Sequence, residues 1–154
     1  MDKQAQGKKN RKSGQAFELK VRKDLERSGW RVCKWMNNVD FGVLGVNGEL
    51  VAAKRKYNPF MRALSIGNGF PDFVAFQLPE NYKNFAVEQE GINKGQFKLY
   101  IVIGVEAKIN GYLTPEERKK CAWLLENNVF SKILIAQKGI KRGEIVYKEF
   151  HFSE

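Results

Sequence analysis

The chain has 154 residues, 43% of them hydrophobic, so it is long enough and apolar enough to fold rather than stay disordered. Lysine and arginine number 27 against 17 acidic residues, and the formal net charge of +10 favours a polyanionic partner, nucleic acid ahead of an anionic membrane. No apolar run approaches the roughly 20 residues of a membrane span and the N-terminus lacks a hydrophobic signal segment, so we expect a soluble, cytoplasmic protein that is not secreted and has no membrane partner.

The N-terminal segment, residues 1–13, is polar and basic, and we expect it to precede a single domain over residues 14–154. It is either a disordered, solvated tail or an arm whose cations bind phosphates. The candidate binding residues here are Lys8, Lys9, Arg11 and Lys12.

A first helix is predicted from near Ser13 to near Ser28, with an apolar stripe at four-residue spacing. That stripe consists of Phe17, Val21 and Leu25. Glu18 borders it and can reach inward where the helix meets a sheet. Spacing alone favours the alternative, an exposed ion pair between Glu18 and Arg22 at i,i+4.

A first strand is predicted over residues 30–35, with Val32 and Lys34 on one face. Asn47-Gly48 then predicts a two-residue hairpin turn between the VLGV and ELVAA runs. The following segment, 54–62, interleaves basic and aromatic residues and is expected to be a loop.

This loop is either a nucleic-acid surface, where cations meet phosphates and rings stack on bases, or a solvated loop packed down by its aromatic rings. Binding is favoured because the loop leads directly to Asp72. The candidate binding residues are Lys54, Arg55, Lys56, Tyr57 and Arg62.

Two acidic residues lie in strand-like runs further along the chain. Pro71 marks the start of one strand, and Asp72 follows it directly. The most hydrophobic strand, 98–107, ends in Glu106-Ala107 and is followed by Lys108. Glu106 and Lys108 share a face because side chains alternate along a strand. If the two strands pair, Asp72 joins them in a compact cluster of two acids and a base.

Two carboxylates at such close quarters repel each other unless a cation lies between them. Hard oxygen ligands without nearby histidine or cysteine favour magnesium or manganese over zinc. The stretch between these strands, residues 79–96, is polar and expected to be a loop or an irregular hairpin extension.

The last third of the chain predicts a turn, a helix and two strands. Asn110-Gly111 makes the turn, and Thr114 caps a helix with Glu117 in the capping box. The helix should end at Asn127-Asn128, before strands over 132–137 and 144–152. Together these elements predict an α/β domain with a mixed central sheet flanked by helices.

The histidine and cysteine content narrows the chemistry. His151 is the only histidine, which excludes two-histidine metal sites and argues against Ser-His or Cys-His catalysis. Cys33 and Cys121 are far apart in apolar patterns and are expected to be free, buried thiols.

The ordered set of motifs resembles the PD-(D/E)xK nuclease superfamily: G-x-x-F-E on a helix (Gly14 to Glu18), Pro-Asp on a strand, and Glu-x-Lys on the next long strand. Over about residues 14–138 the chain is similar to the archaeal Holliday junction resolvases and the VRR-NUC nucleases. The resemblance implies a restriction-endonuclease-like core. It also implies a metal-dependent endonuclease that hydrolyses phosphodiester bonds in branched or junction DNA, in recombination or repair.

Roles follow from the resemblance. Asp72 and Glu106 would bind Mg²⁺ (or Mn²⁺), and Lys108 would orient or activate the attacking water. The backbone carbonyl of Ala107 would also bind the metal. Glu18 matches the first-helix acid of the family and would be a further metal ligand. Glu117 stands where the family often has glutamine, but the capping box already accounts for it.

Two other function classes compete with a nuclease. In a nonenzymatic, basic nucleic-acid-binding module, Glu106 and Lys108 form an ordinary ion pair. A scaffold or membrane-surface protein is disfavoured because the sequence shows no long basic amphipathic helix. Within the nuclease class, an enzyme for two-fold-symmetric junctions should be a homodimer, whereas a flap, nick or single-strand nuclease can be a monomer.

Overall fold

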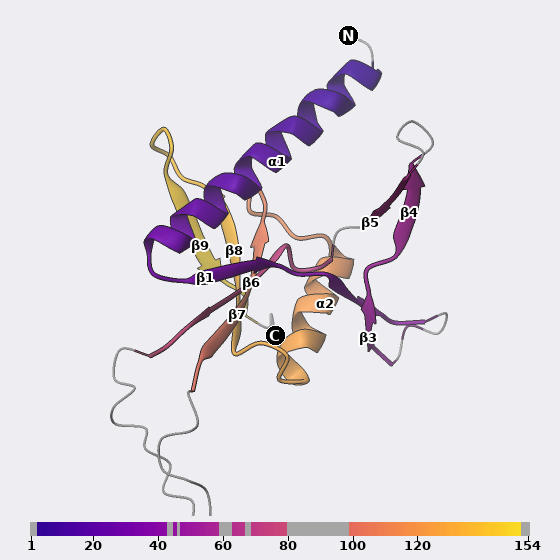
Figure 1. Ribbon diagram of the computed structural model, residues 1–154, viewed down its shortest axis with the longest axis vertical. Coiled ribbons are helices and arrows are strands. Elements are labelled where there is room, and N and C mark those ends of the chain that lie inside the picture. The colour runs from indigo at the N-terminus through magenta and orange to yellow at the C-terminus, as the bar shows by residue number, and fades with distance from the viewer. Residues whose placement is uncertain are drawn as a thin grey trace, which may run out of the picture.

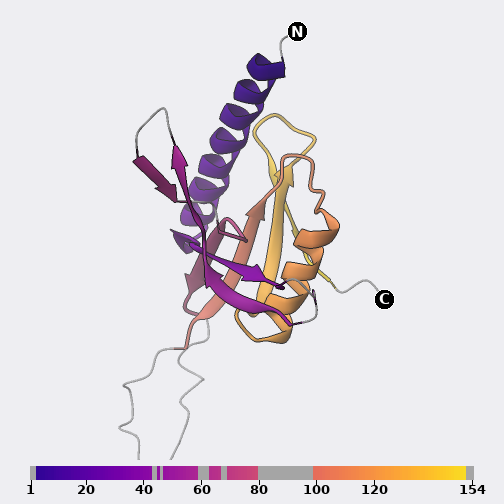
Figure 2. The same ribbon diagram turned by 90° about the vertical axis from the view of Figure 1, so that its right-hand side faces the viewer.

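The computed structural model describes residues 3–42, 45, 47–58, 63–66, 69–79 and 99–151. A five-stranded sheet lies between two helices, with two short hairpins beside it (Figures 1 and 2). The elements are α1 (Lys3–Arg27), β1 (Arg31–Lys34), β2 (Asn37–Asp40), β3 (Glu49–Ala52), β4 (Arg55–Asn58), β5 (Ala63–Ile66), β6 (Phe73–Gln77), β7 (Ile101–Ala107), α2 (Pro115–Glu126), β8 (Lys132–Lys138) and β9 (Ile145–Glu149).

The large sheet has the strand order β1-β6-β7-β8-β9, so β7 is central, as its hydrophobicity predicts. Three of its pairings are antiparallel, and β7 with β8 is parallel. A parallel pair needs a crossover connection, which α2 provides. The predicted α/β class, with a mixed central sheet flanked by helices, is confirmed.

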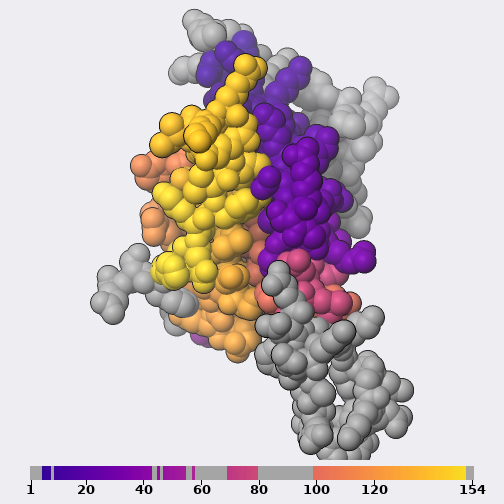
Figure 3. Space-filling view, turned by 90° about the vertical axis from the view of Figure 1, so that its left-hand side faces the viewer, coloured from indigo at the N-terminus to yellow at the C-terminus, as the bar shows by residue number. Residues whose placement is uncertain are grey.

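Helix α1 covers one face of the sheet with the predicted stripe. Its Phe17, Val21 and Leu25 are buried in a cluster with sheet residues that include Ile103 and Val105. The packed part of α1 also lies beside β9 (Figure 3), where Tyr147 Oη donates to Asp24 Oδ2 at 2.9 Å. The apolar spacing therefore identified the buried side of this helix correctly.

Helix α2 covers the other face, and its start matches the prediction closely. The Thr114 side chain accepts from the Glu117 N–H, and the Glu117 side chain accepts from the Thr114 N–H, which is a complete capping box. Cys121 and Leu124 are buried against β8 residues such as Ile133. Burial raises the pKa of the Cys121 thiol to about 12.

Gly104 allows the segment before β6 to approach β7 closely. A Cβ atom at this position would lie 2.9 Å from Pro71 Cγ and 3.1 Å from Phe130 Cδ2. A proline ring cannot rotate away, so any larger side chain would push the Pro71 segment off the sheet. Because Asp72 follows Pro71, this glycine helps to fix the position of an acidic residue of the candidate site.

The start of α1 differs from the prediction. The helix begins at Lys3 rather than near Ser13, so much of the expected tail is helical. These N-terminal turns extend beyond the sheet (Figure 1), and the side chains of Lys9, Arg11 and Lys12 are exposed. Hydrophobic periodicity marks only where a helix packs, so it could not indicate turns that carry no apolar stripe.

The hairpins also differ from the predicted ones. Asp40 pairs with Glu49, so residues 41–48 connect β2 to β3 and Asn47-Gly48 is not a two-residue turn. Residues 43, 44 and 46 of the VLGV run lie outside the described residues. The expected loop after residue 54 instead contains β4, which pairs with β5.

Cys33 is exposed, contrary to the expected buried thiol, whereas Cys121 is buried. Cys33 lies on edge strand β1, on the face opposite to Val32, whereas α2 packs mainly against β2 and β8. The predicted 79–96 loop lies outside the described residues from residue 80 onward. In the part of the chain that the structure describes, neither helix combines the length and apolar character needed to cross a bilayer.

Candidate active site

Strand register places the candidate residues at one end of the sheet. Lys34 pairs with Phe73, and Phe73 pairs in turn with Val105, so these three form a row across β1, β6 and β7. Asp72 immediately precedes Phe73 and thus the start of β6, and Glu106 immediately follows Val105 within β7. Antiparallel pairing therefore makes the two acids neighbours, although they are distant in sequence.

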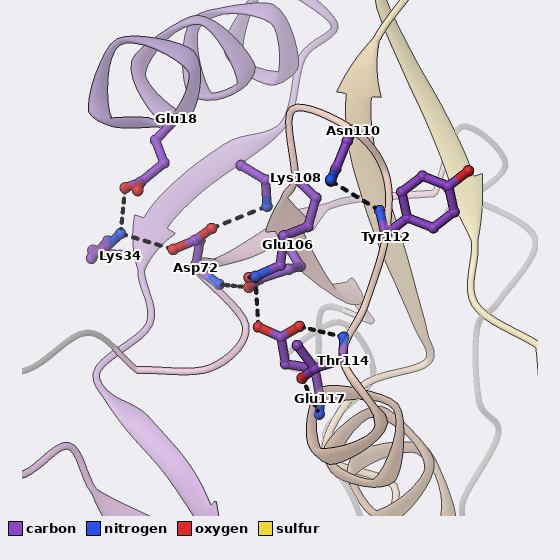
Figure 4. A network of polar contacts seen from close by, with 10 residues as sticks. Glu18, Lys34, Asp72, Glu106, Lys108, Asn110, Tyr112, Thr114 and Glu117 are labelled. Carbon is purple, nitrogen blue, oxygen red and sulfur yellow. Dashed lines mark hydrogen bonds and ion pairs between the residues drawn. The ribbon is translucent and has the colours of Figure 1, made fainter. Parts of the chain in front are cut away.

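Asp72 and Glu106 are joined by hydrogen bonds through the backbone (Figure 4). The Asp72 N–H donates to Glu106 Oε2 at 3.0 Å, and the Ala107 N–H donates to Asp72 Oδ2 at 3.0 Å. Both acids are buried, with 7% and 5% of their surface exposed. Strand geometry thus fixes both carboxylates before any ligand is present.

Two lysines flank this pair, and each bridges two carboxylates (Figure 4). Lys34 Nζ lies 2.8 Å from Glu18 Oε2 and 3.3 Å from Asp72 Oδ1. Lys108 Nζ lies 2.6 Å from Glu117 Oε1 and 3.1 Å from Glu106 Oε1. Each ammonium group therefore connects an acid at the end of the sheet with an acid on a helix.

The four carboxylates and Lys108 line an open pocket of about 380 Å³, and Lys34 contacts two of its lining residues, Glu18 and Asp72. The side chains of Lys34 and Lys108 are 32% and 27% exposed, so solvent and ligands can reach the cluster. None of the described residues that line it is a histidine or a cysteine. The lining includes Glu18, Asp72, Glu106, Ala107, Lys108, Glu117 and Lys120.

Burial and charge perturb the titration of the pocket. Burial, followed by repulsion from Asp72, raises the pKa of Glu106 to about 7. Burial also raises the pKa of Asp72, against the hydrogen bond that it accepts from Ala107. Ionising both Asp72 and Glu106 in the pocket is therefore unfavourable, and an additional positive charge nearby would make it less so.

The flanking groups shift the other way, toward their charged forms. Burial opposes protonation of Lys34 and Lys108, but their carboxylate partners outweigh it and raise the pKa of each. Burial likewise opposes ionisation of Glu117, but the Lys108 ammonium and the Thr114 N–H lower its pKa. These three groups are charged at neutral pH.

The structure brings together the residues that the sequence proposed as catalytic: Asp72, Glu106 and Lys108. Ala107 is in the same pocket. Glu18 also reaches it, which corrects the i,i+4 pairing favoured by spacing, because Arg22 pairs with Glu26 instead at 2.9 Å. Glu18 bonds to Lys34.

The predicted nucleic-acid-binding residues lie outside this pocket. Lys54 and Tyr57 are exposed in the segment from β3 to β4, and β4 extends in the same direction as the N-terminal turns of α1 (Figures 1 and 2). Lys8 belongs to α1, and Arg55 and Lys56 belong to β4, but their side chains lie outside the described part of the structure. Arg62 lies outside it entirely.

Sequence reasoning missed Lys34 and set Glu117 aside. One signal could have indicated Lys34. It shares a strand face with Val32, which is buried, and a charged side chain on a buried face needs a partner. The capping box is a sufficient reason for Glu117 to be where it is, but only one of its oxygens serves the cap. The other oxygen binds Lys108.

Comparisons with protein-family models, with curated proteins and with solved structures found no match to this chain. Among the described residues, no set of three or more Asp, Glu, His or Cys side chains is arranged in a geometry that could hold a metal ion. The two central acids are instead paired with lysines, Asp72 with Lys34 and Glu106 with Lys108.

Proposed function

We propose that this chain is a Mg²⁺- or Mn²⁺-dependent deoxyribonuclease with a restriction-endonuclease-like core, of the PD-(D/E)xK type. One observation carries the proposal: Asp72 and Glu106 lie side by side in an open pocket, with the Lys108 ammonium 3.1 Å from Glu106. Asp72 directly precedes β6, whereas Glu106 lies at the end of β7 and Lys108 directly after it, and their convergence matches the order of motifs in the sequence.

The donor set of the pocket fits a hard divalent cation. Magnesium is commonly held by one or two carboxylates, with waters and substrate phosphates completing its coordination. Asp72 and Glu106 supply two such carboxylates, and a cation between them would offset the burial and repulsion that raise their pKa values. In a regular strand the N–H and C=O of one residue point to the same side, so the Ala107 carbonyl would face the side on which its N–H bonds Asp72.

When bound, the metal would neutralise phosphate charge and make water a stronger nucleophile. Lys108 adds a fixed positive charge where negative charge develops on the transferring phosphoryl group. Glu117 holds that ammonium at 2.6 Å, and its own place at the start of α2 is fixed by the capping box. Lys108 is thus positioned from the helix side and from the strand side.

Nucleic acid suits the charge distribution. The chain has a net charge of +10, although acids line the pocket, so the surface outside it must be strongly basic. Phosphate contacts position a nucleic acid without reading its sequence. Exposed Lys9, Arg11 and Lys12 on α1, with Lys54 and Tyr57, are the described residues that we assign to this role. We favour DNA, branched or junction-containing, which would require a homodimer with two pockets.

A cleavage panel tests the proposal. Four-way junction, flap, duplex and single-stranded DNA are each incubated with the purified protein in Mg²⁺ and in EDTA, and the solution mass is measured in parallel. We expect cleavage in Mg²⁺ only, preferably of branched DNA. Cleavage that persists in EDTA would contradict the metal site, and a monomer that cuts only flaps or single strands would contradict the junction assignment.

One observation favours the alternative, a nonenzymatic nucleic-acid-binding module. All four carboxylates of Glu18, Asp72, Glu106 and Glu117 already accept bonds from protein donors, so the cluster is complete without a metal. Manganese binding separates the two functions. A module would bind DNA but show no specific Mn²⁺ site that depends on Asp72 and Glu106.

A further inference from the structure

Lys34 holds a position that the mechanism above does not use. It ends β1, and its ammonium group contacts Glu18 on α1 and Asp72 before β6, at 2.8 and 3.3 Å. It also lies 5.0 Å from the centre of the buried Phe73 ring, which favours a cation at that point. Strand, ring and two carboxylates therefore fix this positive charge on the Glu18 side of Asp72.

The two sides of Asp72 differ in what they can accept. On the Glu106 side, each carboxylate accepts a backbone N–H, Glu106 Oε2 from Asp72 and Asp72 Oδ2 from Ala107, and the Lys108 ammonium contacts Glu106 but not Asp72. On the Glu18 side, the Lys34 ammonium already lies between the two carboxylates. A cation that used both Glu18 and Asp72 as ligands would have to occupy the place of this ammonium.

Two-metal nucleases place their ions about 3.5–4 Å apart, so the second ion needs carboxylates adjacent to the first. In this chain Asp72 is the acid that two such ions would share, with Glu106 on one side and Glu18 on the other. Lys34 carries one positive charge at the second of these positions and cannot leave it without separating an ion pair on each side.

We propose that Lys34 takes the place of a second metal ion, so that the pocket binds one divalent cation, between Asp72 and Glu106. This inference rests on the proposed function, because it concerns the number of ions in the same site. It changes the expected role of Glu18, which positions Lys34 instead of binding metal. Lys34 becomes a positioning residue that holds Asp72 Oδ1 and leaves the Glu106 side of the pocket to the metal.

Metal stoichiometry tests the proposal without relying on activity. Mn²⁺ is titrated into the metal-free protein, with isothermal titration calorimetry for heat and electron paramagnetic resonance for free Mn²⁺. We expect one Mn²⁺ per chain in the wild type and one in Lys34→Arg, which keeps the charge. Lys34→Met removes the charge at similar length, and we expect it to bind two.

The double variant Lys34→Met/Glu18→Gln locates the added ion, because removing the second carboxylate should return the stoichiometry to one. Glu18→Gln alone should leave it at one, since Glu18 is not a ligand of the first ion. This single variant serves as the second test if Lys34→Met fails to fold, which circular dichroism and thermal unfolding show.

The possible results distinguish a failure of the Lys34 proposal from a failure of the proposed metal-dependent function. A wild type that binds no Mn²⁺ refutes the metal site and the inference with it. A wild type that binds two ions refutes the inference alone, as does a folded Lys34→Met that still binds one. Loss of Mn²⁺ binding in Glu18→Gln would make Glu18 a ligand and would also overturn it.

Discussion

The backbone N–H of Asp72 donates to the side chain of Glu106 at 3.0 Å, so the pairing of two strands directly sets the spacing of two acids. The Ala107 N–H completes the arrangement by donating to Asp72. Groups fixed by backbone bonds need little reorganisation when charge develops beside them, which is the form of preorganisation that catalytic sites use.

Replacing either acid by its amide should abolish cleavage and spare DNA binding. Asp72→Asn and Glu106→Gln keep side-chain size but remove the charge that a divalent cation requires, so we expect cleavage to fall by about 100-fold or more. Single-turnover cleavage in Mg²⁺ measures the loss, and gel-shift titration in EDTA measures binding. Glu126→Gln, an exposed change at the end of α2, is the matched control and should cleave normally. Wild-type cleavage by a pure Asp72→Asn protein would contradict the assignment.

Glu117 should have two separable roles. Glu117→Gln retains a residue suited to the capping box but loses the charge that holds Lys108, so activity should drop while stability changes little. Thr114→Ala removes the side-chain half of the cap but keeps the backbone N–H that bonds Glu117, so it should cost about 0.5–2 kcal/mol of stability with activity retained. Urea unfolding and cleavage assays on both variants test this division. Equal losses of activity in both would mean that Glu117 acts only through the helix.

The metal-free protein should become less stable as the pH rises through about 7. The pKa of Glu106 is raised to about 7 from an ordinary value of 4.5, so the folded state binds this proton more tightly than the unfolded chain. Its stabilising effect is fully present below the unfolded pKa and is lost as the pH rises through the folded one.

Urea unfolding in EDTA at about pH 5.5 and about pH 8 measures this effect. The lost stability should be on the order of 1–3 kcal/mol, and Glu106→Gln should flatten the dependence. Above about pH 5.5 Glu117, whose pKa is lowered, stays ionised and contributes no slope. A wild type as pH-dependent as Glu106→Gln would show that Glu106 is not the titrating group.

The N-terminal turns of α1 should contribute DNA affinity without stability. Lys9, Arg11 and Lys12 are exposed on turns that extend beyond the sheet, so changing all three to alanine should leave the unfolding midpoint unchanged. Binding should weaken, and the slope of log affinity against log salt should fall by about 0.9 for each phosphate that the variant no longer neutralises.

The matched control for this triple variant removes the same charge elsewhere. Lys138, Lys141 and Arg142 are exposed at the β8–β9 connection, and their replacement by alanine should change the salt slope less. Equal slopes in the two triple variants would indicate that net charge, and not the position of the helix, determines binding.

Gly104→Ala should destabilise the protein by about 1–3 kcal/mol, because the added Cβ meets Pro71 and Phe130 in a packed region. Gly7→Ala is the contrast: a Cβ there meets nothing within 4 Å, and replacing a helical glycine should stabilise by about 0.5–1 kcal/mol. Thermal unfolding of both variants measures the difference. An unchanged midpoint for Gly104→Ala would mean that the Pro71 segment can move.

The sequence predicted most of the sheet and both packed helix faces, because those elements carry local patterns. Val21 and Leu25 repeat where α1 packs, and Thr114 and Glu117 mark the start of α2 by residue type alone. The extent of α1 could not be predicted in this way, since its N-terminal turns have charge but no apolar stripe.

The candidate site was predictable only in part. Asp72, Glu106 and Lys108 were found because each lies in or beside a recognisable strand, and pairing of those strands brings them together. Lys34 was missed because nothing in the sequence says that β1 is the neighbour of β6. Spacing along a helix favours a Glu18–Arg22 pair for the same reason, because it takes no account of other elements. In the structure Glu18 pairs with Lys34 of β1 instead.

The hydrogen bonds of the pocket join residues that are 16, 34 and 38 positions apart along the chain. Contacts of such separation require the closure of long loops and form slowly compared with local ones. A chain that has formed only the local β7–α2–β8 unit can therefore pair Lys108 with Glu117, but Glu18 and Asp72 are not yet in place. Nascent or partly folded molecules would lack the assembled acidic centre, and the appearance of this centre would report that folding is complete.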